Sequence, residues 1–290
     1  MTERTIQQII KGMPSSDGDG VKLTRSLGQT PTARLDPFLM LDEFKSDDSA
    51  DYIGGFPPHP HRGFETVTYM LAGAMRHEDS LGNTGYLRAG DVQWMTAARG
   101  IIHSEMPEQK DGLMHGFQLW INLPAEDKMK QPRYQDIASN KIAEIHEEGV
   151  DIRVIVGEVS RHGEVATGPV SAIATEPRYL DVQLQPGVRF EQSTPADHNA
   201  LIYVFDGALE ANGDDGFARL EAGRAGVLSD GDQVVVTAGE AGARFLLLSA
   251  RPIGEPIAQY GPFVMNTREE IEQAIRDYQN GEFSAQPAMQ

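Results

Sequence analysis

Apolar and polar residues alternate in short segments along most of the chain, and clusters of Gly, Pro, Asp and Asn separate these segments. The segments follow one another at spacings of about ten residues, a pattern that is typical of an all-β sandwich or barrel. Helical periodicity is scarce. The predicted strands lie at residues 64–71, 74–79, 91–95 and 115–123 in the first half, and at 152–156, 179–184, 200–205 and 244–250 in the second.

Two local similarities between the halves indicate a duplicated β unit. Residues 70–74 and 204–208 both place a strand ahead of an x-Gly-Ala turn, and residues 87–91 resemble residues 220–224 in spacing. The alternative is that common turn chemistry produces both matches by chance. Residues 124–149 are polar and hold two prolines, as a linker would. We therefore predict an N-terminal domain at residues 1–140 and a C-terminal domain at residues 141–290.

One helix is predicted near the C-terminus. Thr267 is a suitable N-cap, and Glu270 three residues later completes a capping box. Gly281 is placed to end the helix. The predicted apolar face, which we expect to pack against a sheet, consists of Ile271, Ala274, Ile275 and Tyr278.

Composition narrows the classes of function. Cysteine is absent from the 290 residues, so a metal would need histidine and carboxylate ligands, which favour iron, manganese, nickel, copper or zinc. The net charge of −18 opposes direct binding to nucleic acid, although it leaves a basic protein partner open. Neither a leader segment nor a long apolar run is evident, so we expect a cytoplasmic protein that does not bind membranes.

Two pairs of residues at strand spacing carry the candidate chemistry. His59 and His61 are one residue apart, so in a strand both imidazoles point to the same face. His103 and Glu105 repeat this spacing about forty residues later. Taken singly, a His-x-His is often a surface or turn feature, and a histidine beside a carboxylate is often an ordinary hydrogen-bonded pair. Together the four side chains predict a metal site of three histidines and one carboxylate with open coordination positions.

Long motifs around these residues resemble the pirin family of the cupin superfamily. They are GGFPPHPHRGFETVTY at residues 54–69, GDVQWMTAARGIIHSE at 90–105 and HGFQLWINLP at 115–124. The segments at residues 35–44 and 261–275 also resemble pirin sequences, so the resemblance covers most of the chain.

The resemblance implies a bicupin, that is, two consecutive antiparallel β-barrel or jelly-roll domains, here followed by a short C-terminal helix. It implies a metal in the N-terminal barrel and none in the C-terminal barrel, where this chain has His162 and His198 but no His-x-His. The metal implied is Fe(II), with Mn, Ni, Co, Cu and Zn as alternatives. The ligands implied by the resemblance are His59, His61, His103 and Glu105.

Glu65 occupies the place from which other cupins take a carboxylate ligand. Its even spacing from His61 would put it on the same face of a regular strand. The pirin pattern instead takes the carboxylate from Glu105. We therefore expect Glu65 to support the site or the fold without binding the metal.

Aromatic and polar residues near the four ligands are candidates for binding a substrate, although most aromatic residues on alternating strands are barrel core. We single out Gln118, because an amide near an open metal face could orient a substrate hydroxyl. His115 is either a supporting group or a buried, hydrogen-bonded histidine. The full set of candidate substrate-binding residues is Phe56, Trp94, His115 and Gln118.

The resemblance implies two functions from different classes. One is a quercetin 2,3-dioxygenase, similar to some bacterial pirins, which cleaves a flavonol-like substrate with O2 at the metal and uses Glu105 as the general base. The other is a regulatory protein whose iron senses redox state and which binds a transcription factor or a metabolic enzyme. An acidic surface is compatible with both.

Overall fold

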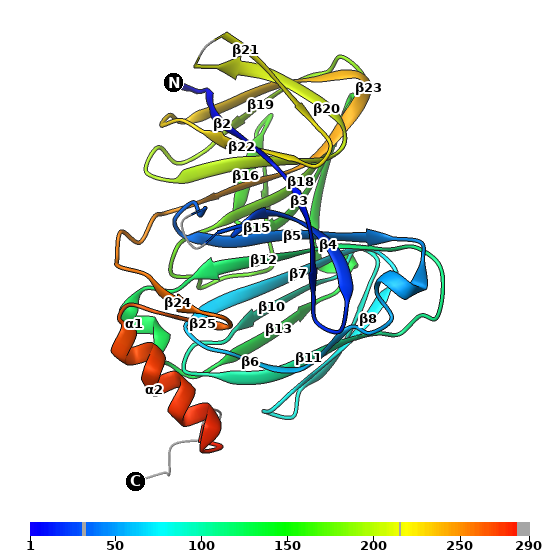
Figure 1. Ribbon diagram of the computed structural model, residues 1–290. Coiled ribbons are helices and arrows are strands. Elements are labelled where there is room, and N and C mark those ends of the chain that lie inside the picture. Colours follow the sequence, from blue (N-terminus) through cyan, green and yellow to red (C-terminus); the bar gives the residue numbers. More distant parts are fainter. Residues whose placement is uncertain (31–32, 215, 283–290) are drawn as a thin grey trace. The chain divides into compact units, whose positions relative to one another are not determined.

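The fold is built almost entirely from strands. The computed structural model describes residues 1–30, 33–214 and 216–282 (Figure 1). Its α-helices within these ranges are α1 (Ala125–Lys128) and α2 (Arg268–Gln279), and neither is long and apolar enough to cross a membrane. The prediction of an all-β protein with a short C-terminal helix is confirmed.

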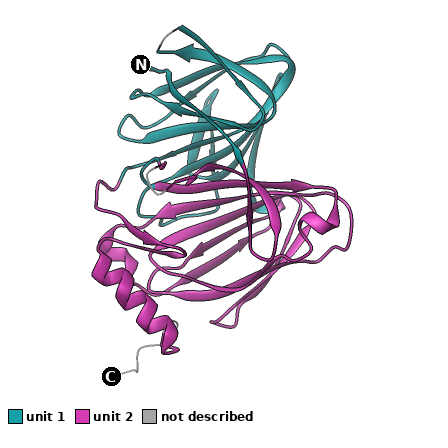
Figure 2. Cartoon of the chain, in the orientation of Figure 1, with its two compact units in different colours: residues 1–13, 35–37, 140–252 teal, residues 14–34, 38–139, 253–290 magenta. Residues whose placement is uncertain are grey.

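The chain forms two compact units, and each unit consists of three separate segments of the sequence (Figure 2). Unit 2 consists of Pro14–Arg34, Phe38–Ser139 and Ile253–Gln290, and unit 1 of Met1–Met13, Leu35–Pro37 and Asn140–Pro252. The chain passes from one unit to the other after Ser139, close to the predicted boundary at 140. The predicted division at residue 140 groups the first residues of the chain with unit 2 and the last ones with unit 1. The structure instead places the first residues in unit 1 and the last ones in unit 2.

Unit 2 contains two antiparallel sheets. The seven-stranded sheet has the order β13 (Arg133–Ile137), β10 (Val92–Thr96), β7 (Phe64–Ala72), β12 (Met114–Asn122), β5 (Phe38–Ser46), β4 (Val21–Leu27) and β3 (Met13–Asp17). The four-stranded sheet has the order β6 (Phe56–His61), β11 (Ile101–Pro107), β8 (Ala74–Asp79) and β9 (Thr84–Arg88). Strands β6, β11 and β8 carry the candidate ligands and their neighbours.

Unit 1 has one ten-stranded sheet and a separate hairpin. The main path runs β14 (Ala143–Glu147), β15 (Val150–Val156), β18 (Arg178–Leu184), β23 (Gln233–Ala250), β20 (Asn199–Gly213), β2 (Ile6–Lys11) and β22 (Arg224–Leu228). Strands β1 (Glu3–Arg4) and β19 (Arg189–Ser193) pair with β23, β21 (Gly216–Glu221) pairs with β20, and the hairpin is β16 (Glu158–Arg161) with β17 (Glu164–Thr167). Its core is mostly aliphatic.

Each predicted strand corresponds to an observed one, with ends that differ by a few residues or more. The segment 74–79 matches β8, whereas residues 200–205 and 244–250 are parts of the much longer β20 and β23. The prediction of a linker at residues 124–149 is wrong. This segment contains β13, which pairs with β10, and β14, which pairs with β15. Its polar residues occupy edge strands, where one side of the backbone faces solvent.

The last described residues return to unit 2. Strands β24 (Ala258–Tyr260) and β25 (Phe263–Met265) form a hairpin, and α2 begins after Thr267 with the predicted capping box. Ile271 and Ala274 are buried against this hairpin, whereas Tyr278 of the predicted apolar face is 41% exposed.

This C-terminal segment is tied to the residues that follow His61. The Arg62 amide donates to Pro262 O at 3.2 Å, and the Val264 amide donates to Arg62 O at 3.0 Å. The Arg62 guanidinium also contacts Asp277 of α2 at 2.7 Å. The approach requires glycine at the next position, because a Cβ on Gly63 would lie 1.9 Å from Val264 O. The turn between β6 and β7 is thus held in place from the far end of the chain.

Candidate metal centre

The pairing of β6 with β11 brings three histidines to one face of the four-stranded sheet. His59 and His61 alternate along β6, and His103 lies directly opposite His59 on β11. Paired residues of neighbouring strands present their side chains on the same side. Ring nitrogens of the three histidines accordingly lie within 4.8 Å of one another, a grouping that could hold a metal ion.

The hydrogen bonds of these rings leave nitrogen lone pairs directed into the cluster. His59 Nδ1 lies 2.8 Å from Pro57 O, so this nitrogen carries the proton and Nε2 is free to accept. His59 Nε2 is 3.0 Å from His61 Nε2. His103 Nε2 is buried and has no hydrogen-bond partner within the described chain. Buried polar atoms of this kind normally have a partner, so the cluster fits a bound metal ion.

Burial also favours the protonation state that metal binding requires. The pKa values of His61 and His103 are held well below the ordinary value, chiefly by desolvation and further by the charges of neighbouring histidines. Both imidazoles are therefore neutral at pH 7, and neutral imidazole is the form that binds a metal.

Glu105 lies on the same strand as His103 but has its own partners. A β-bulge after His103 shifts the register, so Glu105 pairs with Phe56. Its Oε1 is 2.8 Å from the Thr68 hydroxyl, and its Oε2 is 3.4 Å from Gln118 Nε2. The compact grouping of ring nitrogens does not include its carboxylate. Glu105 therefore stays a predicted ligand, placed beside the histidines at the wall of the adjoining cavity.

A second buried pair, which the sequence patterns did not single out, supports His103. His77 Nδ1 lies 3.3 Å from His103 Nδ1, and His77 Nε2 lies 3.5 Å from Asp79 Oδ2. The side chains of His77 and Asp79 are completely buried. The His77 ring also stacks on Tyr134 with a centroid distance of 4.6 Å. A proton on His103 Nδ1 can be donated to His77, which leaves His103 Nε2 free for a metal.

We expect His77→Phe to weaken metal binding while preserving the fold. Phenylalanine keeps the ring stacked on Tyr134 but removes the acceptor for His103 Nδ1. Loss of such a supporting partner costs roughly 10- to 100-fold in metal affinity. A competition titration against a chromophoric chelator measures this change. His146→Phe, at an exposed histidine, serves as the control, and equal affinities of His77→Phe and the wild type would contradict the role.

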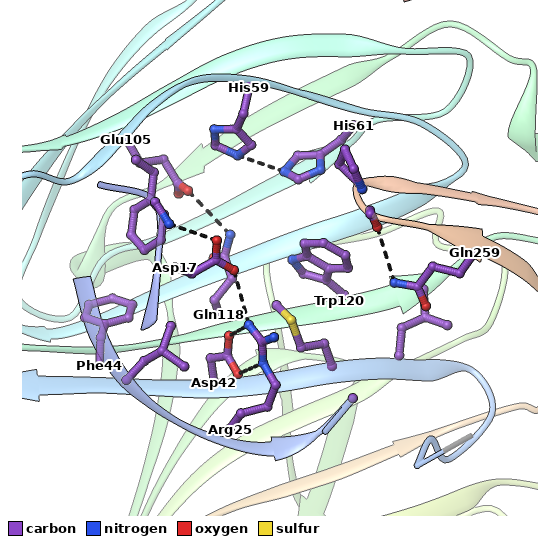
Figure 3. A pocket seen from close by; sticks show the side chains of 18 of the residues that line it. Asp17, Arg25, Asp42, Phe44, His59, His61, Glu105, Gln118, Trp120 and Gln259 are labelled. Atoms are coloured by element: carbon purple, nitrogen blue, oxygen red, sulfur yellow. Dashed lines mark hydrogen bonds and ion pairs between the residues drawn. The ribbon is translucent and has the colours of Figure 1, made fainter. Parts of the chain in front are cut away.

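A cavity of about 760 Å³ opens beside the three histidines, and Figure 3 shows the side chains that line it. His59, His61 and Glu105 lie at one end. Trp120 packs edge-on against His61 with a centroid distance of 5.2 Å and forms part of the wall. The volume falls in the range that holds drug-sized ligands.

The four predicted substrate-binding residues divide into two pairs. Phe56 and Gln118 line this cavity. Trp94 and His115 are not among the lining residues. His115 lies near the start of β12, and its Nε2 is 2.8 Å from Glu43 Oε1. Both side chains are nearly buried. Only Phe56 and Gln118 are therefore retained as candidates for contact with a substrate.

Glu65 faces away from the histidines because the chain between β6 and β7 is irregular. Arg62 and Gly63 separate the two strands, so the even spacing from His61 does not carry over. Phe64, not Glu65, contacts His61, with a centroid distance of 5.0 Å. The Thr96 hydroxyl donates to Glu65 at 2.6 Å, and burial raises the pKa of Glu65 to about 7. The expectation that Glu65 plays a supporting role agrees with this position.

The raised pKa makes a prediction for stability. An unfolded glutamate loses its proton near pH 4.5, whereas folded Glu65 keeps it up to about pH 7. Folding therefore becomes less favourable as the pH rises through this window. We expect Glu65→Gln to be more stable than the wild type by about 3 kcal/mol at pH 8, and by less than about 1 kcal/mol at pH 5.

Melting temperatures of both proteins at the two pH values test this prediction. Glu78→Gln, at an exposed glutamate, should leave the melting temperature nearly unchanged at either pH. A difference between Glu65→Gln and the wild type that does not depend on pH would contradict the assignment.

Fold, site and sequence comparisons agree on the class of protein. A family model described as Pirin matches residues 20–121, and one described as the Pirin C-terminal cupin domain matches residues 179–284. Two cupin domains, of which the first carries the three-histidine cluster, define the chain as a bicupin with a candidate metal centre. The chain belongs to the pirin family.

Relatives at high identity support this assignment over nearly the whole chain. A Pseudomonas aeruginosa protein with the provisional name quercetin 2,3-dioxygenase is 50% identical over 279 residues, which cover 96% of this chain and 97% of that protein. Human pirin is 44% identical over 91% of this chain and 89% of its own length. The crystal structure of a quercetin 2,3-dioxygenase from Acinetobacter baumannii superimposes with a TM-score of 0.86, at 34% identity, and covers 98% of this chain and 99% of that one.

Proposed function

We propose that this protein is an iron-dependent dioxygenase of the quercetin 2,3-dioxygenase type, which cleaves flavonol-like substrates with O2. The observation that carries the proposal is the position of the three-histidine cluster at the wall of a cavity large enough for an aromatic molecule. The names of the Pseudomonas and Acinetobacter relatives support the substrate class.

His59, His61, His103 and Glu105 are the proposed ligands of the metal. Three imidazoles and a carboxylate suit Fe(II), and they also suit the other divalent ions of the first transition series. A bound ion supplies a Lewis acid that favours an ionised substrate oxygen, together with a place for dioxygen. The lowered pKa of His61 and of His103 keeps both ligands neutral, so protons do not compete for them at neutral pH.

Protein groups around the ligands position the substrate and its proton. Glu105 is the proposed base for the flavonol hydroxyl, because its carboxylate faces the cavity and lies within reach of two polar partners. Thr68 has a single hydroxyl proton and lies 2.6 Å from Gln118 Oε1 as well as 2.8 Å from Glu105. It can donate to only one of them, so a proton on Glu105 would be accommodated by donation to Thr68. Trp120 and Phe56 supply flat apolar walls.

The test is turnover of quercetin by protein loaded anaerobically with Fe(II) and then exposed to O2. We expect loss of the flavonol absorption band together with release of carbon monoxide. His61→Ala should abolish both signals, and His146→Ala, at an exposed histidine of unit 1, should leave them unchanged. Metal analysis of the active protein identifies the ion that supports turnover.

Two results would overturn the dioxygenase proposal. One is the absence of turnover by the wild type with every first-row divalent ion, and the other is turnover that persists in His61→Ala. In either case the regulatory function would be tested next, by comparing the proteins captured by the Fe(II) and Fe(III) forms.

A further inference from the structure

The cavity has a second polar end, away from the histidines. In Figure 3, Arg25 and Asp42 lie at the opposite side of the cavity from His59 and His61, and Asp17 is seen between Glu105 and Arg25, at about the level of Trp120. The side chains that line the intervening wall are largely apolar and include Leu23, Leu39, Met40, Phe44 and Phe56. A ligand that fills the cavity would therefore be apolar in its middle and polar at both ends.

A row of paired residues across the seven-stranded sheet connects the two ends. Thr68 on β7 pairs with Gln118 on β12, Gln118 pairs with Asp42 on β5, and Asp42 pairs with Arg25 on β4. Neighbouring strands are about 4.8 Å apart, so this row spans about 14 Å. Thr68 is hydrogen-bonded to Glu105 at one end of the row. The row therefore leads from the Glu105 end of the cavity to the Arg25 end.

The guanidinium of Arg25 is fixed by hydrogen bonds to carboxylates, and it still has N–H groups that can donate to a ligand. Its Nε and Nη2 donate to the two oxygens of Asp42 at 2.8 and 2.7 Å, and Nη2 also lies 3.2 Å from Asp17 Oδ2. The Asp42 side chain is 3% exposed, so this bidentate pair fixes the guanidinium. Nη1 has no protein partner among the described residues, which leaves its two N–H groups available to the cavity.

The charges at this end select the kind of group that can bind. Asp17 and Asp42 share the Arg25 guanidinium, so these three side chains carry one net negative charge, which disfavours carboxylate or phosphate ligands. Asp17 is half-exposed, and its Oδ1 accepts a hydrogen bond from the neighbouring Gly18 amide at 2.8 Å. A neutral hydroxyl can donate to Asp17 and accept from Arg25 Nη1.

We propose that Asp17 and Arg25 bind phenolic hydroxyls on the substrate ring that lies farthest from the histidines. This inference rests on the proposed function, because it assumes that the flavonol hydroxyl lies at the histidine end. For a flavonol the remote ring is the fused benzene ring, because the pendant phenyl ring is attached to the carbon next to the one that carries the hydroxyl. The protein then prefers flavonols with hydroxyls on this ring over flavonols without them, and Asp17 is the main determinant of the preference.

The experiment compares three flavonols that are alike except for no, one or two hydroxyls on the fused benzene ring. Dissociation constants are measured by calorimetry under anaerobic conditions with the metal-loaded protein, and turnover is measured separately in air. We expect the dihydroxy compound to bind about tenfold more tightly than the unsubstituted one, since a hydrogen bond to a charged group contributes about 1.5 kcal/mol or more.

Asp17→Ala should remove this preference and leave the affinity for the unsubstituted flavonol unchanged, because the side chain is half-exposed and the substitution leaves the Arg25–Asp42 pair in place. Asp19→Ala is the matched control, since Asp19 also lines the cavity, whereas the Arg25 guanidinium is bonded to Asp17 and Asp42. Asp17→Asn keeps an acceptor oxygen and should retain part of the preference.

The outcomes separate this inference from the proposed function. A wild-type preference that persists in Asp17→Ala, or no preference in the wild type, overturns the inference even if turnover occurs. A preference that depends on Asp17 without any turnover supports the inference for binding and counts against the dioxygenase. Failure of all three flavonols to bind overturns both.

Discussion

His103→Ala should eliminate stoichiometric metal binding. His103 is the only member of the three-histidine cluster that comes from β11, and it joins the metal site to the His77–Asp79 pair. Removing a ligand should cost more than the roughly 10- to 100-fold that the loss of a supporting partner costs. Elemental analysis after loading and desalting measures the metal content. We expect less than about a tenth of the wild-type value in the variant.

Thermal unfolding distinguishes loss of the ligand from loss of the fold. A ligand that binds only the folded state stabilises it, so a chelator should lower the melting temperature of the loaded wild type. The same chelator should have no effect on His103→Ala. His162→Ala, at a histidine whose side chain is 79% exposed, should behave like the wild type. A variant that keeps full metal content would show that His103 is not a ligand.

Lys128→Met should lower the stability of the folded protein, although Lys128 is not a candidate metal ligand. The Lys128 side chain is completely enclosed, and its Nζ donates to Gly63 O, Asn122 Oδ1 and Val264 O at 2.6, 2.6 and 3.0 Å. Methionine keeps the length of the side chain but leaves three buried oxygens without this donor. Each such group costs about 1–3 kcal/mol. Burial lowers the pKa of Lys128 to about 8, so desolvation offsets part of the loss.

The expected net loss is about 3 kcal/mol, which corresponds to a fall in melting temperature of roughly 6–12 °C. Lys130→Met is the matched control, because Lys130 lies two residues away, is exposed and forms a surface ion pair with Asp127. Its effect should be within about 0.5 kcal/mol. Equal melting temperatures of the two variants would contradict the structural role of Lys128.

Local sequence patterns predicted the features whose geometry is set within a single strand or helix. The alternation of His59 and His61 places both on one face because they lie on the single strand β6. The capping box at Thr267 and Glu270 likewise depends on neighbouring residues alone. The same parity argument fails for Glu65, because the turn at Arg62 and Gly63 interrupts the strand.

Features that depend on the pairing of distant strands had no local signal. His77 and Asp79 alternate in sequence as His59 and His61 do, but their contact with His103 follows from the register of β8 with β11. The pairing of Arg25 with Asp42 depends in the same way on β4 and β5. Alternation shows which face of a strand is buried, whereas it does not specify the neighbouring strand.

The return of the C-terminal segment to unit 2 has a consequence for biosynthesis. The turn that follows His61 is bonded to Pro262 and Val264, and the Lys128 side chain also contacts Val264. A ribosome makes these partners about two hundred residues after His61, at roughly 5–20 residues per second. The nascent unit 2 therefore lacks its last segment while unit 1 is translated, and the turn beside the candidate metal ligands gains these bonds only after Val264 has been made.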